Sequence, residues 1–378
     1  MRIAYFSRTY TAHDLRFLTG IRAHGHEVVF LCLGDVAQGW EKRPLPDGVE
    51  LVALHRNAVH EPADCLEAMP DFEKALARAR PDVLHAGPVP TCGFMSALSG
   101  FRPLVLMSWG SDILVEPERS PASHWAVTCA LRHADVFQCD CDAVRAKALA
   151  LHAMPAGQIV QFPWGIDLSA FDPAGVRAGV REKLGWQDQL VVISNRSWEP
   201  IYGIGTVLES FRVAALADER LRLLLLGHGS EVEMVHAFIR QHHLSGKVCL
   251  AGRIGNDQLA PYLREADFYL SCSHSDGASI SLLEAMAIGL PCIVSDIPGN
   301  REWIVPGEGG WLAPVAEASM FAQVLHAAAA MTAAQRVQLG ERNRSVASAR
   351  ADWSQNLGLL MGAYERLAQG QMTESRGK

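Results

Sequence analysis

Short runs of apolar residues alternate with amphipathic stretches along the whole chain. Each apolar run has the length of a strand that is buried on both faces, and the stretches between the runs have the spacing of helices. Strands that alternate with helices predict parallel sheets covered by helices on both sides. In the first half the predicted strands are RIAYFS, HEVVFLCLG, VELVAL, DVLHAG, PLVLMSWG, DVFQCD and IVQFPWG.

The same pattern starts again in the second half of the chain. The predicted strands there are QLVVISNR, LRLLLLGHG, KVCLAGR, DFYLSCS and PCIVSD. The clearest helices are predicted over residues 14–24, 72–80, 206–217, 231–243 and 259–266. The chain is therefore predicted to be an α/β protein with two doubly wound domains in succession.

The boundary between the two domains is predicted in the stretch FPWGIDLSAFDPAGV, which Pro163, Gly165 and Pro173 interrupt. The predicted parts are a first domain over 1–165, a second over 166–350, and a helix from 351 that packs back towards the first domain before a frayed tail ends at 378. Ligands bind outside the carboxyl ends of the strands in open α/β sheets. We therefore expect the two domains to face each other across a ligand-binding cleft.

Composition and charge narrow the class of protein. The chain has 378 residues, is 49% hydrophobic and carries a formal net charge of −7, which gives no basic surface for nucleic acid. No segment approaches the ~20 apolar residues of a membrane span. The start MRIAYFSRTY has the pattern of a strand and not of a signal peptide. We expect a soluble cytoplasmic protein whose membrane contact is at most peripheral.

The nine cysteines are odd in number and lie mostly in apolar runs, as reduced and packed thiols do. The close pair Cys139 and Cys141 lacks a second pair or a neighbouring histidine, so we expect two core cysteines there and no metal site.

The stretch SDGASISLLEAMAIGLP carries two carboxylates, Asp276 and Glu284, eight positions apart. It predicts a turn followed by a short helix that ends at Gly289. The amides and the positive dipole end of that helix suit a phosphate, and the two acids could then bind sugar hydroxyls on either side. The alternative, which spacing alone leaves open, is that Asp276 only makes a turn and Glu284 is a solvated helix residue.

The longer segment SDGASISLLEAMAIGLPCIVSDIPGNREWI, followed by GEGGWLAP, resembles the signature of the family 4 retaining glycosyltransferases. In that signature two acids eight apart precede an E-A-x-A-x-G-x-P run. GHEVVFL, GIDLSAFDP, NRSWEPIYG, LLLLGHGSE and LREADFYLS extend the resemblance over most of the chain. It implies the GT-B fold, with an acceptor-binding domain first and a Rossmann-like donor-binding domain second.

The resemblance also implies roles for single residues. Asp276 matches the acid that contacts the donor sugar, although the family usually has glutamate there, and Glu284 matches the acid that holds the ribose. Arg196 matches the arginine that neutralises the donor diphosphate, with a surface arginine as the alternative. The remaining donor-side candidates are Tyr202 and Gly203 after the first strand of the second half, Gly277, Ala278 and Ser279 at the helix start, and Gly252, Arg253 and Ile254 near the base.

The chain departs from the family beside Gly203, where Tyr202 stands in place of the usual lysine. Three explanations stay open: the tyrosine hydroxyl substitutes for the lysine, a cation such as Arg8 or Arg301 comes from elsewhere, or the donor is held more weakly.

The first domain departs from the family as well. The H-G-x-D element is WGSD here, with Trp109 in place of the histidine before Asp112. A tryptophan offers a stacking face for a sugar but no general base, and a core aromatic is the alternative. Trp109, Asp112 and Arg8, which stands where many relatives have a glycine-rich turn, are the acceptor-side candidates.

The implied activity is a retaining transfer of a hexosyl group from a UDP- or GDP-linked sugar to a hydroxyl in glycan, glycolipid or small-molecule glycoside biosynthesis. Asp276 and Arg196 are the catalytic candidates. We expect no cofactor besides the nucleotide sugar substrate, and no metal. The acceptor proton would go to the leaving phosphate, unless Asp276 acts as a covalent nucleophile.

Other functions remain to be weighed. A sugar-nucleotide epimerase or phosphorylase would share the nucleotide clamp, and Tyr202 and Trp109 leave room for a catalytically silent sugar-nucleotide-binding subunit. A nicotinamide-dependent oxidoreductase is disfavoured, because GHGSEV and GIGTVL both lack the third glycine of its fingerprint.

Overall fold

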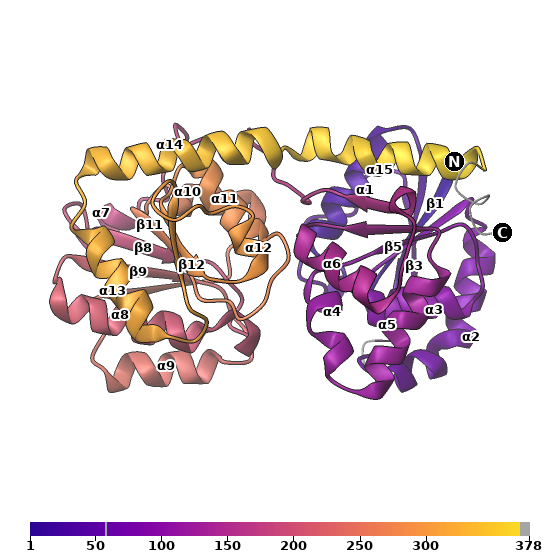
Figure 1. Cartoon of the computed structure of the whole chain (residues 1–378), viewed down its shortest axis with the longest axis horizontal. Helices are drawn as coiled ribbons and strands as arrows, with labels where there is room; N and C mark the ends of the chain where they lie inside the picture. The colour runs from indigo at the N-terminus through magenta and orange to yellow at the C-terminus, as the bar shows by residue number, and fades with distance from the viewer. Residues whose placement is uncertain (57–58, 371–378) are drawn as a thin grey trace. The chain divides into compact units, whose positions relative to one another are not determined.

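The computed structural model describes residues 1–56 and 59–370, and the predicted frayed tail from residue 371 lies outside them. The chain forms two compact units (Figure 1). Met1–Pro163 and the segment that starts at Ser354 form the first unit, and Trp164–Trp353 form the second. The boundary expected after Gly165 lies beside the change of unit at Pro163.

Within the described residues, the first unit is built on a parallel sheet in the order β3-β2-β1-β4-β5-β6-β7. Its strands are β1 (Arg2–Ser7), β2 (Glu27–Cys32), β3 (Val49–Ala53), β4 (Val83–Ala86), β5 (Leu104–Met107), β6 (Val136–Cys139) and β7 (Ile159–Gln161). All seven strands predicted in this half are confirmed. Most of these strands consist of buried apolar residues, because helices cover both faces of the sheet.

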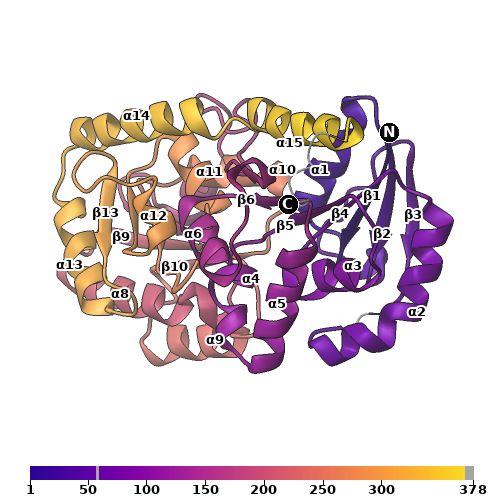
Figure 2. The same ribbon diagram turned by 45° about the vertical axis from the view of Figure 1, so that its right-hand side comes forward.

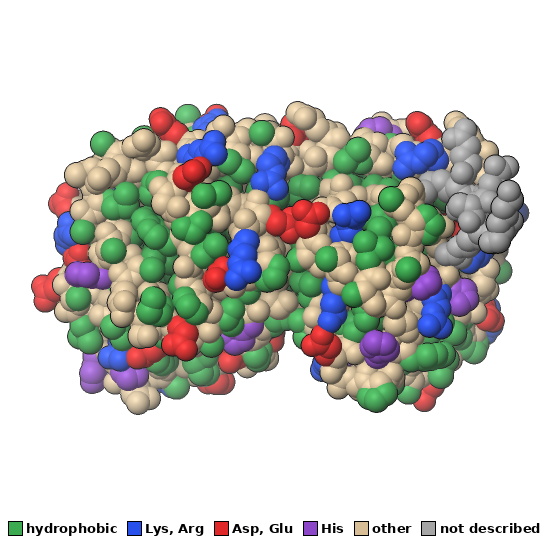
Figure 3. Space-filling view, viewed as in Figure 1, with side chains coloured by type: hydrophobic (Ala, Val, Ile, Leu, Met, Phe, Trp, Pro, Cys, Tyr) green, Lys and Arg blue, Asp and Glu red, His purple; other side chains and the backbone are tan. Residues whose placement is uncertain are grey.

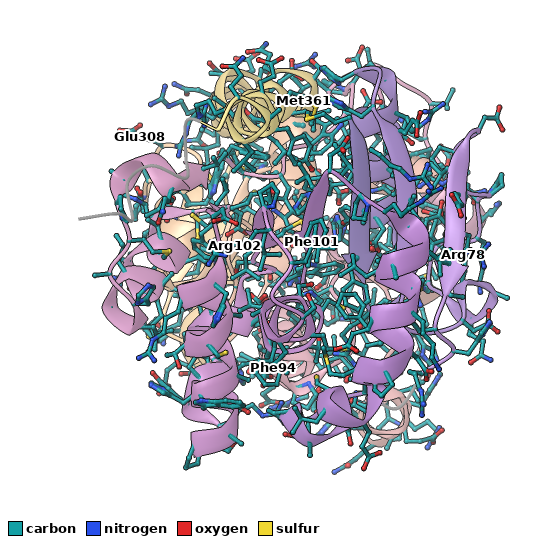
Figure 4. All side chains as sticks on the ribbon, turned by 90° about the vertical axis from the view of Figure 1, so that its right-hand side faces the viewer. Arg78, Phe94, Phe101, Arg102, Glu308 and Met361 are labelled. Atoms are coloured by element: carbon teal, nitrogen blue, oxygen red, sulfur yellow. The ribbon has the colours of Figure 1, made fainter. Side chains whose placement is uncertain are left out.

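The helices of the first unit lie in two layers around this sheet. They are α1 (Ala12–Ala23), α2 (Pro62–Ala79), α3 (Phe94–Leu98), α4 (Ser111–Leu114), α5 (Pro121–His133), α6 (Asp142–Leu151) and α15 (Trp353–Ala368). Figures 1 and 2 show α15 beside α1. Phe94 of α3 and Met361 of α15 lie on opposite sides of the sheet (Figure 4).

Within the described residues, the second unit is built on a parallel sheet in the order β10-β9-β8-β11-β12-β13. Its strands are β8 (Leu190–Ser194), β9 (Leu221–Leu226), β10 (Val248–Gly252), β11 (Phe268–Ser271), β12 (Cys292–Ser295) and β13 (Gly310–Ala313). The five predicted strands are confirmed. The edge strand β13 escaped prediction, because its short apolar run WLA is flanked by the turn-forming residues Gly309, Gly310 and Pro314.

The second unit has a separate apolar core on each face of its sheet. The helices are α7 (Val180–Leu184), α8 (Ile204–Ala217), α9 (Val232–Gln241), α10 (Asn256–Leu263), α11 (Ile280–Ile288), α12 (Pro298–Arg301), α13 (Ala318–Ala329) and α14 (Ala333–Arg350). Side chains alternate along β8, so Val192 joins the core under α8, α9 and α13. Its neighbours Val191 and Ile193 join the core under α10 and α11 on the other face.

Each sheet has one point where the strand order reverses. In the first unit it lies between β1 and β4, and in the second between β8 and β11. Chain segments leave two adjacent strands in opposite directions at such a point, which opens a crevice at their carboxyl ends. Arg196 follows β8 and Asp276 follows β11, so the fold brings these two predicted residues to the same crevice.

Two observations concern the length of the helices and the charges on one face of the molecule. Among the helices that the structure describes, none combines the length and the apolar character that crossing a bilayer requires. On the face drawn in Figure 3, basic and acidic side chains of the described residues are interspersed. Such a mixture produces no extended field of one sign on that face.

A buried hydrogen bond attaches α15 to the sheet of the first unit. His85 of β4 and Tyr364 of α15 are both fully buried, and His85 Nδ1 lies 2.6 Å from Tyr364 Oη. Burial lowers the pKa of His85 to about 3, which the side chain of Gln138 only partly opposes. The imidazole is therefore neutral in the folded protein at neutral pH.

This burial predicts an acid-sensitive contribution to stability. The unfolded chain protonates His85 below its ordinary pKa of about 6.5, whereas the folded chain does not until about pH 3. The contribution is complete above about pH 6.5 and is lost as the pH falls, by on the order of 2 kcal/mol between pH 7 and pH 5. In urea unfolding, the wild type should lose more stability over this range than His85→Gln. Equal losses would contradict the assignment.

Candidate functional site

The guanidinium of Arg196 is held in place on several sides. Nη1 donates hydrogen bonds to Ser279 Oγ at 3.0 Å and to Ser281 Oγ at 2.8 Å. The ring of Tyr202 stacks on the guanidinium, with 4.0 Å between Arg196 Cζ and the ring centroid. The arginine side chain is only 13% exposed. The alternative of a solvated surface arginine is therefore wrong.

Asp276 pairs with this arginine from the turn between β11 and α11. Its Oδ2 lies 2.8 Å from Arg196 Nη2, and its side chain is 18% exposed. The contact has the length of an ion pair but lacks the alignment of a hydrogen bond, since Asp276 Oδ2 has no hydrogen-bond partner among residues 1–56 and 59–370. Burial by itself would lower the pKa of Arg196. The opposing effect of Asp276 and of the other acidic groups around the guanidinium is larger, so the pKa is raised overall and the arginine stays charged.

The beginning of α11 lies next to this ion pair. Ser279 is the N-cap residue, yet its hydroxyl makes no capping bond to the helix and accepts a hydrogen bond from Arg196 instead. Gly277, Ala278 and Ser279 are all buried. The first amides of α11 thus have no side-chain cap, and with the helix dipole they favour an anion. The helix ends at Gly289 in the left-handed conformation, as predicted.

Glu284 lies one turn into α11 and is only 3% exposed. Its Oε1 accepts a hydrogen bond of 2.7 Å from Asn256 Nδ2 at the start of α10. The alternative of a solvated helix residue is therefore wrong. Sequence reasoning missed Asn256, although its place after Gly255 at a helix start, at the carboxyl end of β10, was a signal that could have found it. It also missed Ser281, which the apolar run ISLLEAMAI concealed.

Gly203 brings the loop after β8 against the loop after β11. It has φ of 63°, and a Cβ there would lie 2.2 Å from the carbonyl oxygen of Cys272, so a larger residue does not fit. The amide of His274 donates to the carbonyl of Ile201 in the same place, at 2.8 Å. This close approach places Tyr202 over Arg196. The charge of Arg196 by itself would lower the pKa of Tyr202. Burial and the charge of Asp276 act in the opposite direction with the larger combined effect, so the pKa is raised.

The turn predicted to lie near the base follows the strand at one edge of the sheet. Gly252 ends β10 with φ of 71°, and its carbonyl accepts a hydrogen bond of 2.8 Å from the amide of Gly227. Arg253 is exposed and Ile254 is half-buried. A role for these residues towards a base stays a prediction.

In the first unit, Asp112 organises the turn after β5. Its carboxylate accepts hydrogen bonds from Ser108 Oγ at 2.7 Å and from the backbone amides of Trp109 and Val89 at 2.9 Å each. The side chain is fully buried, and burial raises its pKa to about 6 even though these hydrogen bonds lower it.

The two other acceptor-side candidates follow strands β5 and β1 of the same sheet, which are separated by β4. The half-buried Trp109 meets His13 edge-on, with 6.1 Å between ring centroids. Arg8 follows β1, and its Nη2 lies 2.8 Å from His60 Nδ1. An acceptor-binding role for Trp109, Asp112 and Arg8 stays a prediction.

The described residues contain no group of three or more histidine, cysteine, aspartate or glutamate side chains arranged to hold a metal ion. Cys139 and Cys141 are buried, as expected for core cysteines.

Comparison with known proteins places this geometry in a family. Residues 177–346 match the family model of the group 1 glycosyl transferases, and residues 2–140 match that of the glycosyl transferase 4-like proteins. The two matches together cover most of the chain. The second half of the chain thus matches the group 1 glycosyl transferases, and the first half matches the glycosyl transferase 4-like proteins. These matches confirm the resemblance seen in the signature region.

Two curated relatives are the amylovoran biosynthesis glycosyltransferase AmsK of Erwinia amylovora and the D-inositol 3-phosphate glycosyltransferase of Kineococcus radiotolerans. The first is 30% identical over 32% of this chain and 32% of its own length. The second is 27% identical over 47% of this chain and 43% of its own length. The chain thus aligns with less than half of either relative.

Solved structures resemble the chain over nearly its whole length. Sucrose-phosphate synthase from Thermosynechococcus elongatus has a TM-score of 0.81 at 18% identity, covering 97% of this chain and 99% of that one. HepE from Anabaena in complex with UDP-glucose has a TM-score of 0.79 at 17% identity, covering 96% and 99%. The predicted GT-B fold is confirmed.

Gly299 of α12 supports the turn that carries Asp276, and we predict that Gly299→Ala destabilises the protein. An added Cβ would lie 2.3 Å from the carbonyl oxygen of Gly277 and 2.8 Å from that of Asp276. Such overpacking costs roughly 1–3 kcal/mol. Thermal unfolding should show the loss, and amide hydrogen exchange should show weaker protection over 276–279. Gly205→Ala, where only Met234 comes within 4 Å, is the control and should change little.

Proposed function

We propose that the protein is a retaining, metal-independent glycosyltransferase that moves a sugar from a nucleoside diphosphate sugar to an acceptor hydroxyl. The observation that carries the proposal is the fixed, buried guanidinium of Arg196, held by Ser279 and Ser281 beside the uncapped start of α11. A cation and a helix N-terminus at the reversal point of a parallel sheet form a site for a phosphate.

Side chains of the site can be assigned to the diphosphate, the sugar and the ribose of the nucleotide sugar. The diphosphate would contact Arg196 and the first amides of α11. Arg196 Nε is buried without a hydrogen-bond partner in the described part of the chain, and such a donor is costly unless a ligand or water pairs with it. The donor sugar would contact Asp276. The ribose would contact Glu284, whose Oε1 is oriented by Asn256.

The chemical step is the departure of the nucleoside diphosphate. Negative charge develops on its phosphate oxygens as the glycosidic bond breaks, and Arg196 is already in place to meet that charge. Removal of one such preorganised donor costs roughly 3–4 kcal/mol of transition-state stabilisation in well-studied enzymes. We favour a route in which the leaving phosphate accepts the acceptor's proton on the same face of the sugar, over one in which Asp276 is a covalent nucleophile.

The nature of the donor and the acceptor is part of the proposal. HepE was solved with UDP and with UDP-glucose, which supports a uridine donor as the first to test. Relatives named as D-inositol 3-phosphate glycosyltransferase and phosphatidyl-myo-inositol mannosyltransferase support acceptors that are polyols, glycans or lipid-linked sugars.

Arg196→Ala should weaken the binding of nucleoside diphosphate at least tenfold, because hydrogen bonds to a charged partner contribute about 1.5–3 kcal/mol. Thermal shift with UDP, GDP, ADP and TDP identifies the base, since a ligand at 100 times its Kd stabilises by about 2.7 kcal/mol. Titration calorimetry with that nucleotide then compares the variant with the wild type. Unchanged affinity would show that the phosphates bind elsewhere.

Transfer should continue in a chelator, and the product should keep the anomeric configuration of the donor. The physical reason is that Arg196 and the amides of α11 take the place of a divalent cation at the diphosphate. Proton NMR of the product reports the configuration. Activity that is lost in EDTA and restored by Mg²⁺ or Mn²⁺ would overturn metal independence, and an inverted product would overturn the mechanism.

A further inference from the structure

Asp276 places a negative charge against the cation that the proposed function assigns to the diphosphate. The ion pair spans 2.8 Å between Asp276 Oδ2 and Arg196 Nη2. Glu284 adds a second negative charge, which also raises the pKa of Arg196. These three side chains carry one positive and two negative charges, so a diphosphate that approaches Arg196 meets a cation already neutralised by a carboxylate of the protein.

Arg196 is held by contacts other than the one with Asp276. Nη1 is held by the hydroxyls of Ser279 and Ser281, and Ser281 in turn accepts a hydrogen bond of 3.0 Å from the hydroxyl of the buried Tyr269. The ring of Tyr202 fixes the plane of the guanidinium. The contact that the structure describes between Asp276 and the guanidinium is made through Nη2. Removal of its charge would therefore leave the guanidinium in place and make Nη2 available to another anion.

The carboxylate of Asp276 has capacity for a further partner. Its Oδ2 is buried and accepts no hydrogen bond from the described residues, because the contact with Nη2 is not aligned as one. A buried acceptor that lacks an aligned hydrogen bond gains when a hydroxyl donates to it. A sugar hydroxyl would do so and would draw the carboxylate away from Nη2.

We propose that Asp276 is a specificity-determining residue that competes with the nucleoside diphosphate for Arg196. The inference rests on the proposed function. When the complete nucleotide sugar binds, its sugar hydroxyls engage Asp276 and release Arg196 for the phosphates. The nucleoside diphosphate alone has no such hydroxyls and meets the intact ion pair. The site thus binds substrate in preference to the product that remains after transfer, which favours product release.

Titration calorimetry of the full chain with UDP and UDP-glucose, repeated with GDP and GDP-mannose, tests the proposal. In the wild type, the nucleotide sugar should bind more tightly than the matching diphosphate. Asp276→Asn should bind the diphosphate about tenfold more tightly, which corresponds to about 1.4 kcal/mol. The same variant should gain little or lose affinity for the nucleotide sugar, because a carboxylate contact to the hydroxyls is lost. The preference for the nucleotide sugar should therefore disappear.

Glu209→Gln is the matched control. It removes one negative charge from the same unit, but Glu209 pairs with Arg212 on α8 and not with Arg196. It should change neither affinity by more than about twofold. Asp276→Ser removes the same charge with a smaller side chain and should reproduce the result. Thermal unfolding identifies which of the two Asp276 variants is folded and suitable for titration.

The outcomes separate this inference from the proposed function. A wild type that binds both ligands and transfers sugar, with Asp276→Asn binding the diphosphate no more tightly, overturns the competition and leaves the transferase intact. A wild type that binds neither diphosphate nor nucleotide sugar contradicts the proposed function and this inference together.

Discussion

The second unit depends on one constraint: a charged guanidinium must remain buried at the carboxyl edge of its sheet. An isolated charge in this place would be costly, because burial removes its hydration. Two hydroxyls, one carboxylate and one aromatic face replace that hydration around Arg196. They come from the segments after β8 and β11, so the reversal of strand order between these strands is what makes the arrangement possible.

Close backbone contacts support this arrangement. Gly203 allows the loop after β8 to approach the carbonyl of Cys272, and Gly299 allows α12 to approach the turn at Asp276. Gly227, after β9, allows a third close approach, since a Cβ there would lie 2.5 Å from the carbonyl oxygen of Arg196. Glycines at these positions let three loops pack without side chains between them. The loops then behave as one rigid support for the side chains of the site.

The positions of the strands could be predicted from the sequence more completely than the contacts between residues that are distant along the chain. Buried parallel strands are nearly continuous apolar runs, so twelve strands of the two sheets could be recognised, whereas β13 begins with a glycine and lies between turn-forming residues that conceal its short apolar run. Asp276 and Glu284 were singled out by their spacing around the start of a predicted helix, and the family resemblance then assigned roles to them and to Arg196. Asn256 and Gly299 were not, because their importance comes from what folding places beside them. Gly299 must remain a glycine because the backbone of Gly277, 22 residues earlier in the chain, packs against it. Local sequence spacing cannot indicate such a contact.

Asp112 and Asp276 show why carboxylates at the ends of strands have different uses. The carboxylate of Asp112 accepts from a serine hydroxyl and two backbone amides, so its lone pairs stabilise a turn. Burial without a cation raises the pKa of Asp112 to about 6. Asp276 has a cation beside it and a buried oxygen without a hydrogen-bond partner in the described chain. Asp276 therefore has a cation beside it and an oxygen that can still accept a hydrogen bond from a ligand, whereas the lone pairs of Asp112 are used within its own turn.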